Sequence, residues 1–270
     1  MSAPSFSDTL PLTRADEGVW AGETDPGYSN GASGAFVGQF GGWVSAALLK
    51  AALLEAADGQ RARSLTAHFL TPVRPGAFRL QVRPLRKGKS VSFLQVELMQ
   101  GADIRAQATV TIGAEREDQN AHQFVARPDA PPPETEGLGA FTPPTPFGRS
   151  LEARWVSGAP FMGEDGARSL FWSRTATPSR LDAVALALLA DYMPPRVFYV
   201  TNAFVPSSTL SLTIHFHANT DDLAAVGESH VLVEVRGRRV GGGYWDHSAS
   251  FFSAAGALLA TTEQVALHRG

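Results

Sequence analysis

The sequence predicts an α+β protein made of two copies of one unit, in which an apolar helix precedes an antiparallel sheet. Three observations support this prediction. The hexamers SLTAHF at residues 64–69 and SLTIHF at residues 211–216 are almost identical. An apolar helical pattern precedes each hexamer, and alternating strand patterns follow it. A proline-rich stretch separates the two sets, so duplication of a structural unit explains the repeat better than chance does.

Residues 41–57, GGWVSAALLKAALLEAA, form the predicted helix of the first copy, with apolar residues such as Val44, Ala47 and Ala51 at helical spacing. Because the segment is apolar almost all round, we expect other elements to enclose it. Four strand patterns separated by turn signals follow this helix, at residues 64–69, 78–85, 90–100 and 103–112.

The second copy repeats this order. Residues 181–193, LDAVALALLADYM, form the predicted helix, and Pro194-Pro195 ends it. Strand patterns follow at residues 210–216, 230–240, 242–252 and 257–267. Each half is therefore expected to have a sheet with one long central helix, and edge-to-edge pairing of the halves would join two sheets into one curved sheet.

The boundary between the copies lies in a segment rich in proline. Residues 128–147 hold seven of the 18 prolines, which favours an extended linker over a helix or a central strand. We therefore predict a first unit at residues 1–115, a linker at 116–149 and a second unit at 150–270.

Composition excludes several classes of protein. The formal net charge of −3 gives no basic excess for binding nucleic acid, and the absence of cysteine excludes disulfides and thiolate metal sites. The N-terminus lacks the pattern of a signal peptide, and no apolar run approaches the ~20 residues of a membrane helix. A cytoplasmic protein with no membrane partner is expected.

Three stretches resemble one family: QFGGWVSAAL at the first helix, SLTAHFLTPVRPG after it, and LLATTEQVAL in the last strand. They are similar to the acyl-CoA thioesterase II (TesB-like) family, which has a double hotdog fold. Trp43 departs from the pattern, because the family often has Gln there. The resemblance implies hydrolysis of an acyl-CoA thioester to free acid and coenzyme A without a cofactor, and it also implies pairing into a homodimer.

The resemblance further implies a catalytic set that binds and activates a water. Carried over position by position, the set is Asp191 after the second helix, Thr209 in the next strand and Gln264 in the last strand. Ser208 and Ser211 stand beside Thr209, so a change of register would give the role to another hydroxyl.

The residues themselves support a role for Asp191. It ends a helix in which residues 183–190 are all apolar, and both burial and the helix C-terminus disfavour a carboxylate there. A carboxyl group with a raised pKa that can reach water is suited to general-base catalysis. The alternative is a solvent-facing helix end that pairs with Arg196.

Two further groups are candidates for substrate binding. Gly41 and Gly42 leave backbone N–H groups uncovered at the start of the first helix, where they could bind an oxyanion; the alternative is that glycine allows a tight turn or close packing. Arg86, Lys87 and Lys89, in one of two basic clusters, could bind the phosphates of coenzyme A, although charge is also normal in a hairpin turn.

The two halves differ at the proposed site. Ala51 stands at the place in the first helix that Asp191 takes in the second, and Thr109 stands where Gln264 falls in the second copy. We therefore expect one complete catalytic site, with the carboxylate from the C-terminal half.

Two other functions stay open at this point. One is a hotdog enoyl-CoA hydratase or dehydratase, although the first helix lacks its Asp/His signature; the other is a non-catalytic acyl-CoA binding protein. His215 and His217 share a strand face, but no carboxylate accompanies them and we predict no metal site. No GxSxG motif is present, which argues against an α/β-hydrolase.

Overall fold

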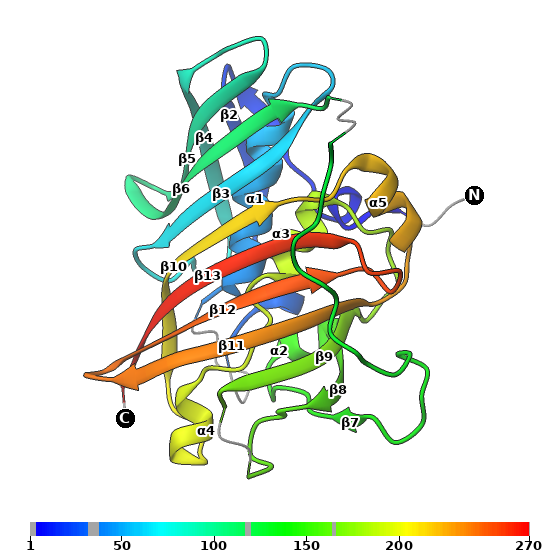
Figure 1. The fold of residues 1–270 in the computed structure, drawn as a ribbon. Coiled ribbons are helices and arrows are strands. Elements are labelled where there is room, and N and C mark those ends of the chain that lie inside the picture. Colours follow the sequence, from blue (N-terminus) through cyan, green and yellow to red (C-terminus); the bar gives the residue numbers. More distant parts are fainter. Residues whose placement is uncertain (1–3, 32–37, 117–119, 164–165, 270) are drawn as a thin grey trace.

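A computed structural model describes residues 4–31, 38–116, 120–163 and 166–269. Every strand in these residues belongs to one antiparallel sheet of 13 strands (Figure 1). The strand order is β1-β2-β4-β5-β6-β3-β10-β13-β12-β11-β9-β8-β7, so the strands of the N-terminal half occupy one side of the sheet and those of the C-terminal half the other.

The strands of the first half are β1 (Thr13–Asp16), β2 (Val19–Glu23), β3 (Gln60–Phe69), β4 (Ala77–Arg86), β5 (Val91–Gln100) and β6 (Asp103–Ala114). Those of the second are β7 (Gly139–Ala140), β8 (Leu151–Ser157), β9 (Arg168–Thr175), β10 (Ser207–Phe216), β11 (Val231–Gly241), β12 (Tyr244–Phe252) and β13 (Leu258–His268). The helices are η1 (Phe6–Thr9), η2 (Pro26–Tyr28), α1 (Gly41–Leu54), α2 (Pro146–Ser150), α3 (Ala183–Leu189), α4 (Val197–Thr201) and α5 (Thr220–Val226).

The repeated hexamers lie side by side where the halves meet. Strand β3 pairs antiparallel with β10, and Thr66 lies opposite Thr213, the residue at the same position of the other hexamer. Their hydroxyl oxygens are 3.2 Å apart. An antiparallel pair in which equivalent residues face each other has local two-fold symmetry, so the duplication seen in the sequence is also a symmetry of the sheet at this point.

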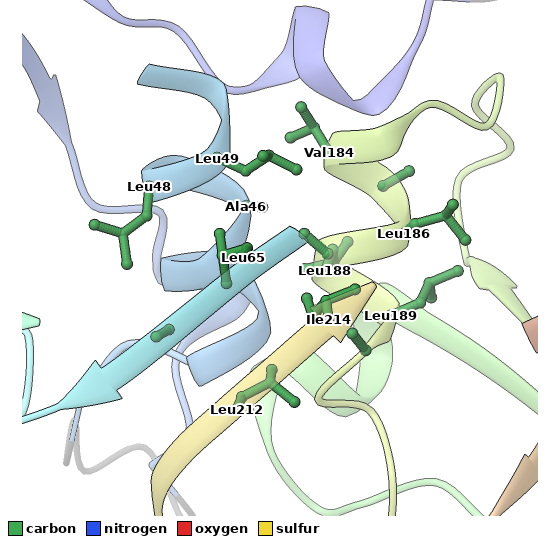
Figure 2. Close-up of a cluster of buried hydrophobic side chains, with 14 of the residues drawn as sticks. Ala46, Leu48, Leu49, Leu65, Val184, Leu186, Leu188, Leu189, Leu212 and Ile214 are labelled. Carbon is green, nitrogen blue, oxygen red and sulfur yellow. The ribbon is translucent and has the colours of Figure 1, made fainter. Parts of the chain in front are cut away.

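Helices α1 and α3 pack against each other, and α1 also packs against β3, β4, β5 and β6. Leucines such as Leu48, Leu65 and Leu188 belong to the core around the two helices (Figure 2). Nearly every side chain of α1 from Gly42 to Ala52 is buried, which explains why its sequence is apolar on all sides. Helix α3 begins after Asp182, whose carboxylate accepts a hydrogen bond of 2.7 Å from the backbone N–H of Ala185.

The predicted elements agree with the structure in the strands and differ in the helices. Helix α1 ends at Leu54, not at residue 57, and α3 spans Ala183–Leu189 instead of residues 181–193. The predicted sheets form one continuous sheet. Strands also precede each helix, β1 and β2 in the first half and β8 and β9 in the second, and the sequence reading did not assign them. No described helix is long and apolar enough to span a membrane.

The proline-rich segment runs along the outer side of the sheet (Figure 1). The indole N–H of Trp172 donates to the carbonyl of Pro131 at 2.8 Å, and the N–H of Leu258 donates to the side chain of Gln123 at 2.7 Å. A second, smaller core lies under the segment and contains Trp172 and Phe252. The predicted linker is thus packed against the C-terminal half. It also contains the short edge strand β7 and the start of α2, which the proline content did not indicate.

Candidate active site

Asp191 lies just after the end of α3, facing the start of α1. Its carboxylate accepts a hydrogen bond from the backbone N–H of Gly42. A β-carbon on Gly42 would lie 2.2 Å from the carbonyl oxygen of Leu188, so only glycine allows α1 to approach α3 this closely. The prediction that Gly41 and Gly42 bind an oxyanion stays untested. The structure shows that the N–H of Gly42 is directed to Asp191.

The side chains of Asp191, Thr209 and Gln264 form a closed set of hydrogen bonds. Thr209 Oγ1 donates to Asp191 Oδ1 at 3.2 Å. Gln264 Nε2 donates to the same Oδ1 at 2.6 Å and to Thr209 Oγ1 at 2.7 Å. The structure therefore brings together the three residues that were picked out by family resemblance.

The strand register explains why Thr209 is the hydroxyl that meets Asp191. Strand β10 has a bulge between Thr209 and Ser211 in its pairing with β13. Thr209 is half-buried beside Gln264 of the neighbouring strand, whereas Ser208 points to solvent. The alternative in which Ser208 or Ser211 replaces Thr209 finds no hydrogen bond to Asp191 among the described residues.

The surroundings of Asp191 make its carboxyl group unusually basic. Burial raises its pKa from 3.8 to about 7, although hydrogen bonds from Thr209, Gln264 and the Gly42 N–H lower it in part. The residue as a whole keeps some exposed surface. A carboxyl group that exchanges its proton near neutral pH is suited to accept a proton from a water bound beside it.

His247 is a neighbour of this set that the sequence reading did not single out. It lies directly opposite Gln264 in the β12–β13 pair, and both residues are almost fully buried. Gln264 Oε1 and both ring nitrogens of His247 have no hydrogen-bond partner among the described residues. Burial and the charge of Arg196 hold the His247 pKa well below 6.5, so the ring is neutral and keeps one N–H to offer Oε1. Strand alternation could have found it, because His247 shares a face with Trp245 and Phe251.

The predicted phosphate-binding residues lie far from Asp191. Arg86, Lys87 and Lys89 are exposed in the β4–β5 hairpin, where the carbonyl of Gly88 accepts a 3.2 Å hydrogen bond from Gln60. Gln60 follows the C-terminal end of α1, whereas Asp191 meets its N-terminal end. Because a helix of 14 residues is about 21 Å long, the chain does not bring this hairpin to Asp191.

The two neighbouring histidines, His215 and His217, have different surroundings. His215 is exposed, and a ring nitrogen of His217 lies 3.0 Å from the hydroxyl oxygen of Thr261. No group of three or more His, Cys, Asp or Glu side chains suited to a metal ion occurs among the described residues.

The chain matches two family models. Residues 31–113 match the acyl-CoA thioesterase N-terminal domain, and residues 123–268 match the acyl-CoA thioesterase C-terminal domain. No curated protein matches the chain in a sequence search.

Several solved structures share the fold. A hotdog-fold protein from Alicyclobacillus acidocaldarius is 29% identical, with a TM-score of 0.89 over 98% of each chain. A TesB protein from Mycobacterium avium is 22% identical, with a TM-score of 0.79 over 97% of this chain and 98% of that one. An acyl-CoA thioesterase II from Mycobacterium marinum is 20% identical, with a TM-score of 0.77 over 98% of each chain.

Proposed function

We propose, from the premise that this chain belongs to the acyl-CoA thioesterase family and hydrolyses acyl-CoA thioesters, that Asp191 activates the attacking water as a general base. The observation that supports this role is the hydrogen-bonded set of Asp191, Thr209 and Gln264 around a carboxyl group whose pKa is raised to about 7. Each of the three residues comes from the C-terminal half, and the α1 end that faces them comes from the N-terminal half.

In the proposed reaction the ionised Asp191 accepts a proton from a water molecule while the oxygen of that water attacks the thioester carbonyl carbon. The carbonyl π electrons move to oxygen and give a tetrahedral oxyanion. Its collapse breaks the carbon–sulfur bond, and the proton on Asp191 passes to the leaving sulfur, which gives free acid and coenzyme A. Thr209 and Gln264 orient the carboxylate. The backbone N–H of Gly41 is the proposed donor to the oxyanion, because the N–H of Gly42 is directed to Asp191.

We also propose that the sheet consists of two hotdog units, residues 1–115 and 150–270, with α1 and α3 as their central helices and residues 116–149 between them. The face-to-face position of Thr66 and Thr213 supports this division. A cytoplasmic location and pairing into a homodimer stay predictions.

Substitution Asp191→Asn tests the proposed role. The amide keeps the size of the side chain but cannot accept a proton, so kcat for release of thiol from acyl-CoA should fall about 10²- to 10⁴-fold. Glu263→Gln is the matched control. Glu263 is adjacent to Gln264 in the chain, but its side chain lies on the opposite, exposed face of β13 and pairs with Arg238. A panel of acyl-CoA chain lengths should be used. Normal turnover by Asp191→Asn would refute the proposal.

A further inference from the structure

The local symmetry at the seam defines a second place equivalent to the proposed catalytic site. Ala62 stands three residues before Leu65 in β3, as Thr209 stands three residues before Leu212 in β10. Both strands have a bulge at this point, between Ala62 and Ser64 in one and between Thr209 and Ser211 in the other. Ala62 is therefore the counterpart of Thr209.

The same register identifies the counterpart of Gln264. Leu212 pairs with Gln264, and Leu65 pairs with Val110. Val110, and not Thr109, thus corresponds to Gln264, so the predicted equivalence of Thr109 and Gln264 is wrong by one residue. Because side chains alternate between faces, that one residue decides which side chain points to the helices.

The counterpart of Asp191 is also apolar. Asp191 lies two residues after the last residue of α3, and the same position after α1 is Ala56, so the earlier match to Ala51 does not hold in the structure. The second place consequently has Ala56, Ala62 and Val110 where the first has a carboxylate, a hydroxyl and an amide. It has no group that could activate water.

This second place is nevertheless hollow. A cavity of 240 Å³ lies between the end of α1 and the start of α3, where Leu53, Ala62, Leu186 and Phe216 contribute to its lining. Phe216 is the repeat counterpart of Phe69, whose ring would lie 3.4 Å from a β-carbon on Gly41 in the catalytic half of the structure. Of the three counterpart residues Ala62 lines the cavity, so the cavity borders the symmetry counterpart of the catalytic site on the side of Ala62 and Phe216.

We propose that this cavity binds a fatty acid, with the hydrocarbon chain between α1 and α3 and the carboxylate on Arg61, and does not hydrolyse its ligand. The inference rests on the proposed function, because it treats the set around Asp191 as the catalytic site and this cavity as bordering the non-catalytic counterpart of that site. Free fatty acid belongs to the product class of thioester hydrolysis.

The lining fits this ligand in both of its parts. Apolar side chains make most of the wall, and the volume lies below the ~300–1,000 Å³ of pockets for drug-sized ligands, so it suits a short alkyl chain better than a nucleotide. Arg61 is the cation in the wall. Its Nη1 donates to the carbonyl of Ala218 at 3.2 Å and its Nη2 pairs with Glu115, while the buried Nε has no hydrogen-bond partner among the described residues.

Glu115 sets a condition for binding. Its carboxylate holds one side of the Arg61 guanidinium, and the Nε atom is buried from solvent, so a ligand carboxylate must displace Glu115, whose side chain is 40% exposed. Guanidinium groups bind carboxylates through two parallel N–H donors, and the two Nη groups can supply such a pair once Glu115 has moved away.

Titration of the full chain with octanoate carrying ¹³C in its carboxyl group tests the proposal. Acetate, which lacks the chain, and octanol, which lacks the carboxylate, should both compete at least tenfold more weakly. Arg61→Gln should weaken octanoate binding about tenfold or more, because a charge-assisted hydrogen bond is lost. Arg63→Gln is the matched control, since Arg63 lies two residues away and donates to the carbonyl of Ala114 outside the cavity.

Ala62→Leu is a second variant that should fill the cavity and abolish this binding. Thiol release by each variant at saturating acyl-CoA reports whether the fold is intact. Octanoate binding that is absent in the wild type, or equal in the wild type, Arg61→Gln and Ala62→Leu, would overturn the proposal. The titration is repeated in Asp191→Asn, which should bind octanoate as the wild type does. Thiol release by this variant tests the catalytic proposal, and octanoate binding tests the cavity proposal, so each can fail without the other.

Discussion

A β-carbon on Gly41 would lie 2.5 Å from Oδ2 of Asp191, so the carboxylate occupies the space that any side chain at Gly41 would need. Gly41, the first residue of α1, has no side chain and therefore leaves room for the Asp191 carboxylate. The two glycines therefore have separate steric roles, since Gly41 faces the carboxylate and Gly42 faces the backbone of α3.

Substitution Gly41→Ala should lower kcat at least tenfold while the protein stays folded. The added methyl group must push Asp191 away from Thr209 and Gln264, because the contact would be far shorter than real carbon–oxygen contacts. Thiol-release kinetics and circular dichroism measure the two effects. Gly241→Ala is the control, because the nearest atom to its β-carbon would be 3.6 Å away. Equal turnover in both variants would show that Asp191 need not be held in this position.

The rate should depend on pH through the pKa of Asp191. A general base works only when ionised, and burial raises this pKa to about 7. We expect kcat/KM to rise tenfold per pH unit below about 7 and to level off above it. A profile measured between about pH 5 and 9 checks this. A flat profile, or an inflection near the ordinary pKa of aspartate, would contradict the assignment.

The same raised pKa predicts that Asp191 reduces stability at alkaline pH. The folded state holds the Asp191 proton more tightly than the unfolded chain does. The stability that comes from this tighter proton binding is fully present below about pH 4 and is lost as pH rises through about 7. Asp191→Asn removes the buried charge and should raise the free energy of unfolding at pH 8 by at most about 4 kcal/mol. The gain should vanish near pH 4.

Urea unfolding at the two pH values measures that difference, with Glu263→Gln again as the exposed control. An Asp191→Asn protein that is less stable than the wild type at pH 8 would show that the hydrogen bonds to the carboxylate outweigh the cost of its burial.

His247 should act as a positioning residue for Gln264. Its N–H can hold Oε1, which leaves Nε2 directed to Asp191 at 2.6 Å. His247→Leu should lower kcat about tenfold and move the rising limb of the pH profile to higher pH, because a weaker hydrogen bond from Gln264 no longer lowers the Asp191 pKa. His247→Gln restores an N–H donor and should recover much of both effects. A leucine variant with an unshifted limb would rule the role out.

Periodicity was sufficient to predict most of the fold. Strict alternation located the strands on both sides of the seam, and the repeated hexamer identified the central pair β3 and β10. The exposed pattern of β1 has no such alternation, and β9 is buried almost throughout, so neither gave a period-two signal. The end of α3 was misplaced because Pro194 marks a stop but does not say how many residues before it leave the helix.

The catalytic set was less predictable from residue types alone. Asp191 had a physical argument from its apolar helix, but Thr209 and Gln264 are ordinary strand residues, and only the resemblance selected them. Their convergence depends on the bulge beside Leu210, which no local pattern indicates. The equivalences of Ala51 and Thr109 failed for the same reason, since they required the register of strands and helix ends that only three-dimensional pairing fixes.

The proline-rich segment determines how the chain can be divided in the laboratory. Pro131 accepts the hydrogen bond of Trp172, and Gln123 accepts that of Leu258. A C-terminal fragment that started at residue 150 would lack both residues and would expose the small apolar core around Trp172 on the outer face of its sheet. Such a fragment should aggregate, whereas one that starts before Ala121 keeps the segment that shields this apolar surface from solvent.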